Sequence, residues 1–185
     1  MPRTKTTPGA IALTAARVFR ERGYHATSMS DLAAATGLTK GAFYHHFPDK
    51  AAVMAAALRT VTAAARERVF DRLLDADLLP EERLAIMQRG AERLFVDARG
   101  GCLIANTVLE TRGVDDRFAP LLAEFVDAWR EGLTAIARDA GHVTPAAAAE
   151  ACVADVEGSV VLMRLYGDRA YLDRALARMR QTLVP

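Results

Sequence analysis

The sequence contains little cysteine: Cys102 and Cys152 are the only two among 185 residues. Two thiols are too few for a disulfide framework, and they lack the paired spacing of a zinc site. His142 is isolated, and the neighbouring His45 and His46 diverge around a helix, so no metal-binding motif is present. We therefore expect no metal or cofactor, and a reducing cytoplasm as the compartment.

Long apolar runs and alternating strand patterns are also lacking. No apolar run approaches the roughly 18 residues that indicate a membrane span, and the basic N-terminus has no apolar segment behind it. Alternation typical of strands and the dipeptides typical of hairpins are absent, whereas apolar residues recur at helical spacing nearly everywhere. We expect a soluble, untargeted, all-α protein.

Net charge is close to zero, at +1, but it is unevenly distributed. Residues 1–50 carry seven basic and three acidic residues, a net charge of +4, which leaves 17 basic and 20 acidic residues, or −3, for the remainder. Arg3 and Lys5 contribute to the basic end, which also holds all three lysines and three of the four histidines. A basic footprint at one end is typical of a nucleic-acid-binding protein. Chance clustering of solvated charges is the alternative.

Caps and apolar spacing predict about nine helices, divided between a domain of residues 1–50 and a bundle of residues 51–185. The first helix opens at Thr7-Pro8 and stops at Gly23. The next two follow Thr27 or Ser28 and Thr39, and end at Gly37 and before Pro48. Asp49 caps a long helix to about Leu74 whose apolar side is Val53, Ala57, Val61, Ala65, Val69 and Leu73. Five further helices are expected after the break at 75–80, over 102–111, from Phe118 to Gly141, from Thr144-Pro145, and after Gly167-Asp168.

The second and third helices match a helix-turn-helix, in which the second member enters a DNA major groove. Ala33 lets the helices approach, Gly37 makes the turn, and the apolar Leu32, Leu38 and Phe43 set the angle between them.

Residues around this motif suit a polyanion. Thr27, Ser28 and Thr39 stand at helix starts, where free N–H groups favour phosphate, although they could be mere caps. Lys40 supplies charge, as does Lys50 unless it is a solvated first-turn residue. Further candidates are Tyr44 and His45, whereas His46 is expected to pack beside Phe47.

The segment GYHATSMSDLAAATGLTKGAFYHHFPDK, residues 23–50, resembles the signature of the TetR family of bacterial regulators. The resemblance is strong over about residues 8–55, with Phe43 where leucine is commoner and Asp49 where serine often caps. It implies a homodimer that reads a palindromic operator, with Lys40, Gly41, Tyr44 and His45 on bases and phosphates. The same resemblance implies that the DNA backbone is contacted by Thr27, Ser28, Thr39 and Lys50.

Effector binding between the middle helices would, by this resemblance, tilt the long helix and oppose operator binding. A pocket in a helical bundle is mostly apolar with a few polar groups, and each apolar candidate could equally be ordinary core. The candidates are Met87, Phe95, Cys102, Asn106, Phe118, Phe125, Trp129 and Met163. The stretch GCLIANTVLE, residues 101–110, is similar to a segment of a large subgroup of such regulators, some of which sense electrophiles or small toxic compounds.

Cys102 follows Gly100-Gly101 at a helix start with Arg99 nearby, which favours a reactive thiolate and hence a redox-sensing or electrophile-sensing repressor as the alternative function. Inert packing is the competing interpretation, and it is the one we expect for Cys152.

Residues 144–184 are the expected dimer interface, in which small and apolar residues would pack against a symmetry mate. These residues could instead complete the monomer's own core. The set is Ala148, Ala149, Gly158, Ser159, Val160, Met163, Tyr171, Leu172 and Met179.

An enzyme is not expected, because a Cys102–His142 pair would lack an orienting third group and an oxyanion loop. A helical binding protein without DNA activity would leave the charge asymmetry unexplained.

Overall fold

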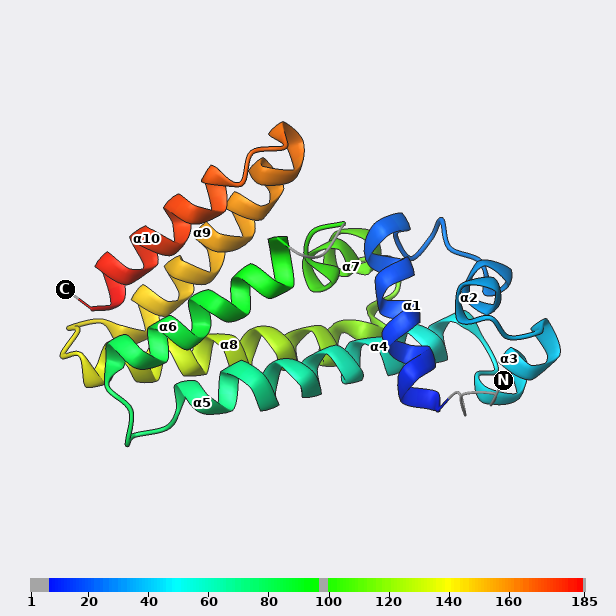
Figure 1. Cartoon of the computed structure of the whole chain (residues 1–185), viewed down its shortest axis with the longest axis horizontal. Coiled ribbons are helices and arrows are strands. Elements are labelled where there is room, and N and C mark those ends of the chain that lie inside the picture. The colour runs from blue at the N-terminus through cyan, green and yellow to red at the C-terminus, as the bar shows by residue number, and fades with distance from the viewer. Residues whose placement is uncertain (1–6, 97–99, 185) are drawn as a thin grey trace, which may run out of the picture. The chain divides into compact units, whose positions relative to one another are not determined.

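The computed structural model describes residues 7–96 and 100–184, and within these ranges it is all-helical, without strands. The helices divide into two compact units, one of Met1–Ala63 with Leu103–Leu122, the other of Ala64–Cys102 with Ala123–Pro185 (Figure 1). The sequence predicts a boundary near residue 50 instead. The first unit also contains residues 51–63 and the segment 103–122, which includes α7 (Leu103–Thr111).

The first unit contains α1 (Pro8–Arg22), α2 (Met29–Thr36), α3 (Lys40–His46), α7 and most of α4 (Lys50–Ala65). Local signals start and stop these helices as predicted. Thr7 caps α1 by accepting the Ala10 N–H at 3.2 Å, and the Oδ1 atom of Asp49 accepts the Ala52 N–H at 2.7 Å. The apolar faces of α1 and α4 form the core of this unit, with Ile11, Ala15, Phe19, Val53, Met54, Ala57 and Leu58 buried.

The predicted long helix from Asp49 to Leu74 is interrupted by a π-helical turn. After α4 come the π turn η1 (Arg66–Phe70) and the short α5 (Asp71–Leu73). A π turn inserts an extra residue per turn and so rotates the helix face that follows it. Phe70 is buried as a result, whereas Val69, from the predicted apolar side, is only half-buried, as are Val61 and Ala65.

The second unit contains η1, α5, α6 (Pro80–Ala91) with its π turn η2 (Glu92–Val96), most of α8 (Ala119–Asp139), α9 (Pro145–Tyr166) and α10 (Ala170–Leu183). The 3₁₀ turn η3 (Asp116–Phe118), in the first unit, leads into α8. α9 and α10 pack along each other as an antiparallel hairpin that turns at Gly167. With α4, η1 and α5 counted as one helical run, and η2 and η3 joined to their neighbours, the described ranges hold the nine helices predicted.

Two glycines of the second unit lie where a neighbouring segment approaches their backbone closely. A Cβ atom on Gly90 would lie 2.6 Å from Cγ2 of Val69, and one on Gly132 would lie 2.8 Å from the Leu73 side chain. These glycines let α6 and α8 pack tightly against the η1–α5 segment. Arg83 is also buried here, and it pairs with Asp139 at 2.6 Å.

Candidate nucleic-acid interface

The helix-turn-helix is formed by α2 and α3. Gly37 adopts a left-handed conformation (φ 69°, ψ 16°), and its N–H points to carbonyl groups at the end of α2. Such a turn is strained for residues with a Cβ atom, so Gly37 permits the tight reversal into α3. Leu32, Ala33 and Phe43 are buried between the helices, as predicted, whereas Leu38 is half-exposed.

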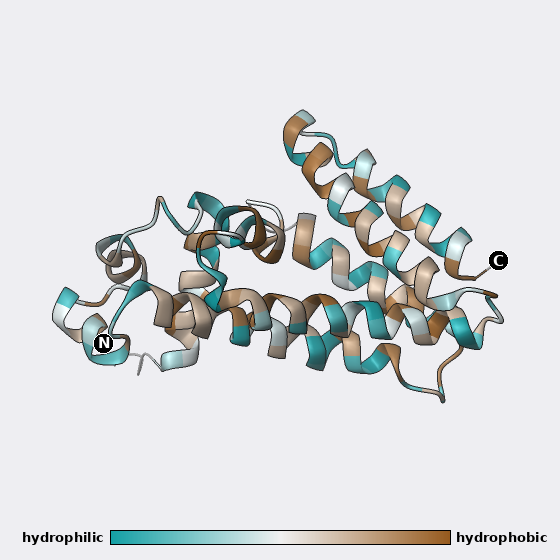
Figure 2. Ribbon diagram, turned by 180° about the vertical axis from the view of Figure 1, so that it is seen from behind, coloured by the Kyte–Doolittle hydropathy of each residue, from teal (hydrophilic) through white to brown (hydrophobic). Residues whose placement is uncertain are grey.

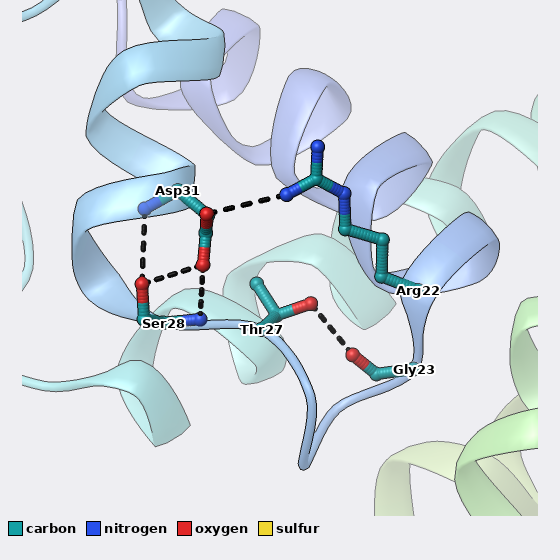
Figure 3. A network of polar contacts seen from close by, with 5 residues as sticks. All are labelled: Arg22, Gly23, Thr27, Ser28 and Asp31. Atoms are coloured by element: carbon teal, nitrogen blue, oxygen red, sulfur yellow. Dashed lines mark hydrogen bonds and ion pairs between the residues drawn. The ribbon is translucent and has the colours of Figure 1, made fainter.

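A capping box starts α2 (Figure 3). The Oγ atom of Ser28 accepts the Asp31 N–H at 3.1 Å, and the Asp31 carboxylate accepts the Ser28 N–H at 2.9 Å and the Ser28 hydroxyl at 2.5 Å. Arg22 of α1 pairs with the same carboxylate at 3.2 Å. The hydrogen bonds from Ser28, and then the charge of Arg22, lower the pKa of Asp31. The box therefore ties the start of α2 to the end of α1.

Thr27 requires a correction. Its side chain is only 1% exposed, and its hydroxyl donates to the Gly23 carbonyl at 2.6 Å (Figure 3). Because the hydroxyl proton is already used inside the turn, the side chain does not offer it to a phosphate. Thr27 stabilises the α1–α2 connection.

Lys50 also differs from both of its predicted roles. Its Nζ atom donates to the Tyr24 carbonyl at 2.8 Å and lies 4.5 Å from the centre of the Tyr24 ring, with the His25 carbonyl at 3.4 Å. The side chain is half-buried, so it is neither a solvated first-turn residue nor a free cation. Lys50 ties the start of α4 to the α1–α2 turn.

α3 presents the remaining candidates to solvent. Lys40, Gly41 and His45 are exposed, and Tyr44 is 46% exposed although it is a large ring. Thr39 caps the helix by accepting the Ala42 N–H at 3.3 Å, which leaves its hydroxyl proton for another acceptor.

Two further predictions concern the basic end of the chain. His46 does not pack beside Phe47, because its side chain is exposed and only Phe47 is buried. Arg3 and Lys5 lie outside the described residues.

The expected pocket residues divide between the two units. Asn106 and Phe118 belong to the first unit, where Asn106 donates to the Arg20 carbonyl at 3.3 Å and Phe118 meets the Tyr24 ring edge-on at 5.3 Å. Those contacts give both residues a packing role. The other six candidates lie in the second unit, where all but the half-buried Met163 are buried: Met87, Phe95, Cys102, Phe125, Trp129 and Met163.

Neither cysteine has the surroundings of a reactive thiol. Cys102 is 4% exposed and hydrogen-bonds the carboxyl group of Glu157, whereas reactive cysteines lie in electropositive, partly exposed places. Arg99 lies outside the described residues. Burial, and then the charge of Asp155, raises the pKa of Cys152 to about 11, which fits its predicted core position. The sensor alternative for Cys102 is not favoured.

A Cys102–His142 pair is not expected from the sequence, and His142 has a contact of its own before α9. The Nδ1 atom of His142 accepts the Thr144 N–H at 3.0 Å, and Thr144 does not cap α9 with its own side chain. Among residues 7–96 and 100–184 there is no group of three acidic, histidine or cysteine side chains that could hold a metal. No helix within the same ranges is long and apolar enough to cross a membrane.

Three features were missed by the sequence interpretation. Glu110 contacts the α1–α2 turn, Glu157 is a carboxyl group within the second unit, and α9 carries an exposed apolar seam. Glu110 ends the quoted segment 101–110, and the seam has a heptad spacing, so signals for both were present. Nothing in the sequence distinguishes Glu157 from an exposed helical glutamate.

A capped helix-turn-helix with an exposed second helix, joined to a helical bundle, defines a DNA-binding regulatory protein. Residues 11–57 match the family model described as bacterial regulatory proteins, tetR family, and residues 80–179 match a tetracyclin repressor-like C-terminal domain. The chain belongs to the TetR family, whose members are DNA-binding transcriptional regulators that bind operator DNA as dimers.

Relatives cover nearly the whole chain. The chain is 31% identical to an uncharacterized HTH-type transcriptional regulator of Mycobacterium tuberculosis over 94% of its length and 92% of that protein's. It is 27% identical to the HTH-type transcriptional repressor DhaR of a Mycobacterium species, with 91% and 88% covered.

Solved structures show the same fold. A TetR transcriptional regulator from Legionella pneumophila superposes with a TM-score of 0.87 at 22% identity, covering 99% of this chain and 100% of that one. A TetR-family regulator from Cytophaga hutchinsonii gives 0.77 at 26% identity, with 99% and 96% covered.

Proposed function

We propose that this regulator is a homodimeric repressor that binds a palindromic operator through α3 and is released by a small molecule. The observation that carries the proposal is the exposure of Lys40, Tyr44 and His45 on a seven-residue helix whose buried side is fully used by Phe43. The similarity to DhaR, a transcriptional repressor of a Mycobacterium species, supports repression over activation.

Each exposed group has a chemical role. We assign Lys40 and the hydroxyl of Thr39, both at the start of α3, to contacts with phosphates. Tyr44 and His45 offer hydrogen bonds and flat faces to base edges. Gly41 lies between Lys40 and Tyr44 in the sequence, and a Cβ atom built on it would meet no atom within 4 Å, so its lack of a side chain is not required by the fold. We assign the lack of a side chain at Gly41 to close approach of DNA.

Ser28 makes an indirect contribution. Its hydroxyl is bonded to Asp31, so its side chain is used in capping α2. We assign it the role of ordering α2.

An exposed seam along α9, in the second unit, supports the proposal of a dimer. Its members are small or apolar, all are exposed, and they recur at alternating intervals of four and three residues: Ala147, Ala151, Ala154, Gly158, Val161 and Leu165. Figure 2 colours the C-terminal turns of α9 predominantly hydrophobic. Heptad spacing of this kind is typical of a helix that pairs with another helix. Most residues proposed from sequence for this interface (Ala148, Ala149, Ser159, Val160, Leu172 and Met179) are instead buried in the chain's own α9–α10 packing.

The effector site is proposed within the second unit. Phe95 and Trp129 lie with ring centres 6.5 Å apart, and the buried Nε1 atom of Trp129 finds no hydrogen-bond partner among the described residues. Oε2 of Glu157 is likewise buried without one. Since buried polar groups are normally satisfied, a small and largely apolar molecule with hydrogen-bonding groups suits these residues.

The test is a titration of labelled DNA from the regions flanking the chain's own gene, at several salt concentrations. Lys40→Ala should weaken binding to all DNA and reduce the salt slope by about one. Tyr44→Ala should weaken operator binding by roughly tenfold or more, without changing that slope. Gly41→Ala should leave stability intact but weaken operator binding.

Arg89→Ala is the matched control, because it removes one positive charge from an exposed position on α6 of the second unit. Equal losses for Arg89→Ala and Lys40→Ala would contradict the assignment of α3. Absence of binding by the wild-type chain to flanking and genome-derived fragments would favour a helical binding protein without DNA activity.

A further inference from the structure

The α1–α2 turn is held from outside the helix-turn-helix by α7. The carboxylate of Glu110 accepts the His25 N–H at 3.0 Å, and the Nε2 atom of His25 lies 3.1 Å from the Glu110 carbonyl oxygen. One turn earlier on α7, Asn106 donates to the Arg20 carbonyl at 3.3 Å. Asn106 and Glu110, four residues apart on α7, therefore hydrogen-bond the end of α1 and the backbone that follows it.

Gly23 fits this arrangement closely. Its φ is +88°, and a Cβ atom on it would lie 2.7 and 2.9 Å from the carboxylate oxygens of Glu110. The glycine thus ends α1 and also leaves the space that the carboxylate occupies. The backbone of Gly23 and the carboxylate of Glu110 are therefore in close contact, with no space for a side chain at position 23.

The same turn sets where α2 begins. Thr27 bonds back to Gly23, and Ser28 caps α2 directly afterwards. α3 follows α2 after a single tight turn at Gly37, so a change at the α1–α2 turn is passed to the exposed face of α3. The position of the reading helix therefore depends on groups held by α7.

We propose that Asn106 and Glu110, here called the α7 latch, are positioning residues for DNA recognition. They do not touch DNA themselves, and they hold the helix-turn-helix in the arrangement that discriminates an operator from other DNA. This accounts for the polar Asn106 and Glu110 of the segment 101–110. The inference rests on the proposed function, in that α3 reads operator DNA.

The DNA test compares wild type with Glu110→Ala, Glu110→Gln and Asn106→Ala on a flanking-region fragment and on a scrambled fragment of equal length. A hydrogen bond to a charged acceptor is strong enough that Glu110→Ala should lower affinity for the flanking fragment by about tenfold. Affinity for scrambled DNA and the salt slope should be unchanged, because no phosphate contact is lost. Glu110→Gln keeps an acceptor and should retain most of the affinity.

Leu109→Ala is the control, because it alters the neighbouring position of α7, where the side chain is 81% exposed. Circular dichroism verifies that each variant is folded. Full operator affinity in a folded Glu110→Ala variant, or equal losses on both DNA fragments, would overturn the positioning role.

Hydrogen exchange without DNA tests the latch independently. Amides of residues 23–28 should exchange faster in Glu110→Ala than in wild type or Leu109→Ala, because the His25 N–H loses its acceptor. Unchanged exchange at residues 23–28 would refute the α7 latch, whatever the results of the DNA-binding test. A wild-type chain that prefers neither a flanking nor a genome-derived fragment would refute the proposed function instead.

Discussion

Glu157 illustrates how burial acts at the scale of one residue. Burial raises the pKa of this carboxyl group, and the hydrogen bond from Cys102 partly opposes the change. Below about pH 4.3, the ordinary value for glutamate, folded and unfolded chains both hold the proton. As the pH rises above that value, the unfolded chain releases its proton first, so this group makes the folded state progressively less stable.

Glu157→Gln should remove that pH dependence. Relative to wild type, the variant should gain thermal stability as the pH is raised from 5 to 8, because an amide of nearly the same shape has no proton to lose. Melting temperatures at the two pH values, compared with those of the exposed Glu150→Gln, provide the measurement. An identical pH trend in the two variants would show that Glu157 is ionised at no cost to folding.

At the same scale, residue type alone does not reveal role. Thr27 and Thr39 both precede short helices, yet one hydroxyl is used in a buried turn and the other is left at the surface. Lys40 and Lys50 differ in the same way. Sequence could propose these residues for DNA contact, but only the positions of neighbouring carbonyl groups separate them.

At the scale of elements, most helix starts and ends follow from local chemistry. Caps at Thr7, Ser28, Thr39 and Asp49 satisfy N–H groups within three residues, and glycines at 23 and 37 end the first two helices. The π turn at Arg66–Phe70 could not be predicted in this way. It depends on how Phe70 meets Phe125 and how Val69 meets Gly90, which are contacts with distant parts of the chain.

Gly90→Ala tests that close packing. The new methyl group would lie 2.6 Å from a branched side chain that has little freedom, so the variant should lose about 1–3 kcal/mol of unfolding free energy despite the better helix propensity of alanine. Urea denaturation measures the loss. Gly9→Ala is the matched control, because nothing lies within 4 Å of its Cβ position and stability should be kept or improved. Equal midpoints for the two variants would contradict tight packing at Gly90.

At the scale of the whole molecule, the α9 seam makes self-association the expected state. Val161 and Leu165 are 57% and 69% exposed, which is costly for apolar side chains unless a partner covers them. A twofold dimer would also match two copies of α3 to the two halves of a palindrome.

Leu165→Glu should therefore dissociate the dimer, since it places a charge within the seam. Light scattering after gel filtration should show the monomer mass, and operator affinity should fall by at least tenfold because one half-site is lost. Val143→Glu, at a position 94% exposed outside the helices, should remain dimeric. A dimer that survives Leu165→Glu would place the interface elsewhere.

The sequence by itself determined the helical class, the caps, the helix-turn-helix and the basic end, because these depend on interactions within a few residues and on apolar spacing. Only the tertiary structure decided which face of α9 is core and which is seam. It also decided that Thr27 and Lys50 brace a turn, and that α7 belongs with the DNA-reading unit. Those outcomes depend on contacts between segments far apart in the sequence, such as Glu110 and His25, 85 positions apart, which no local pattern encodes.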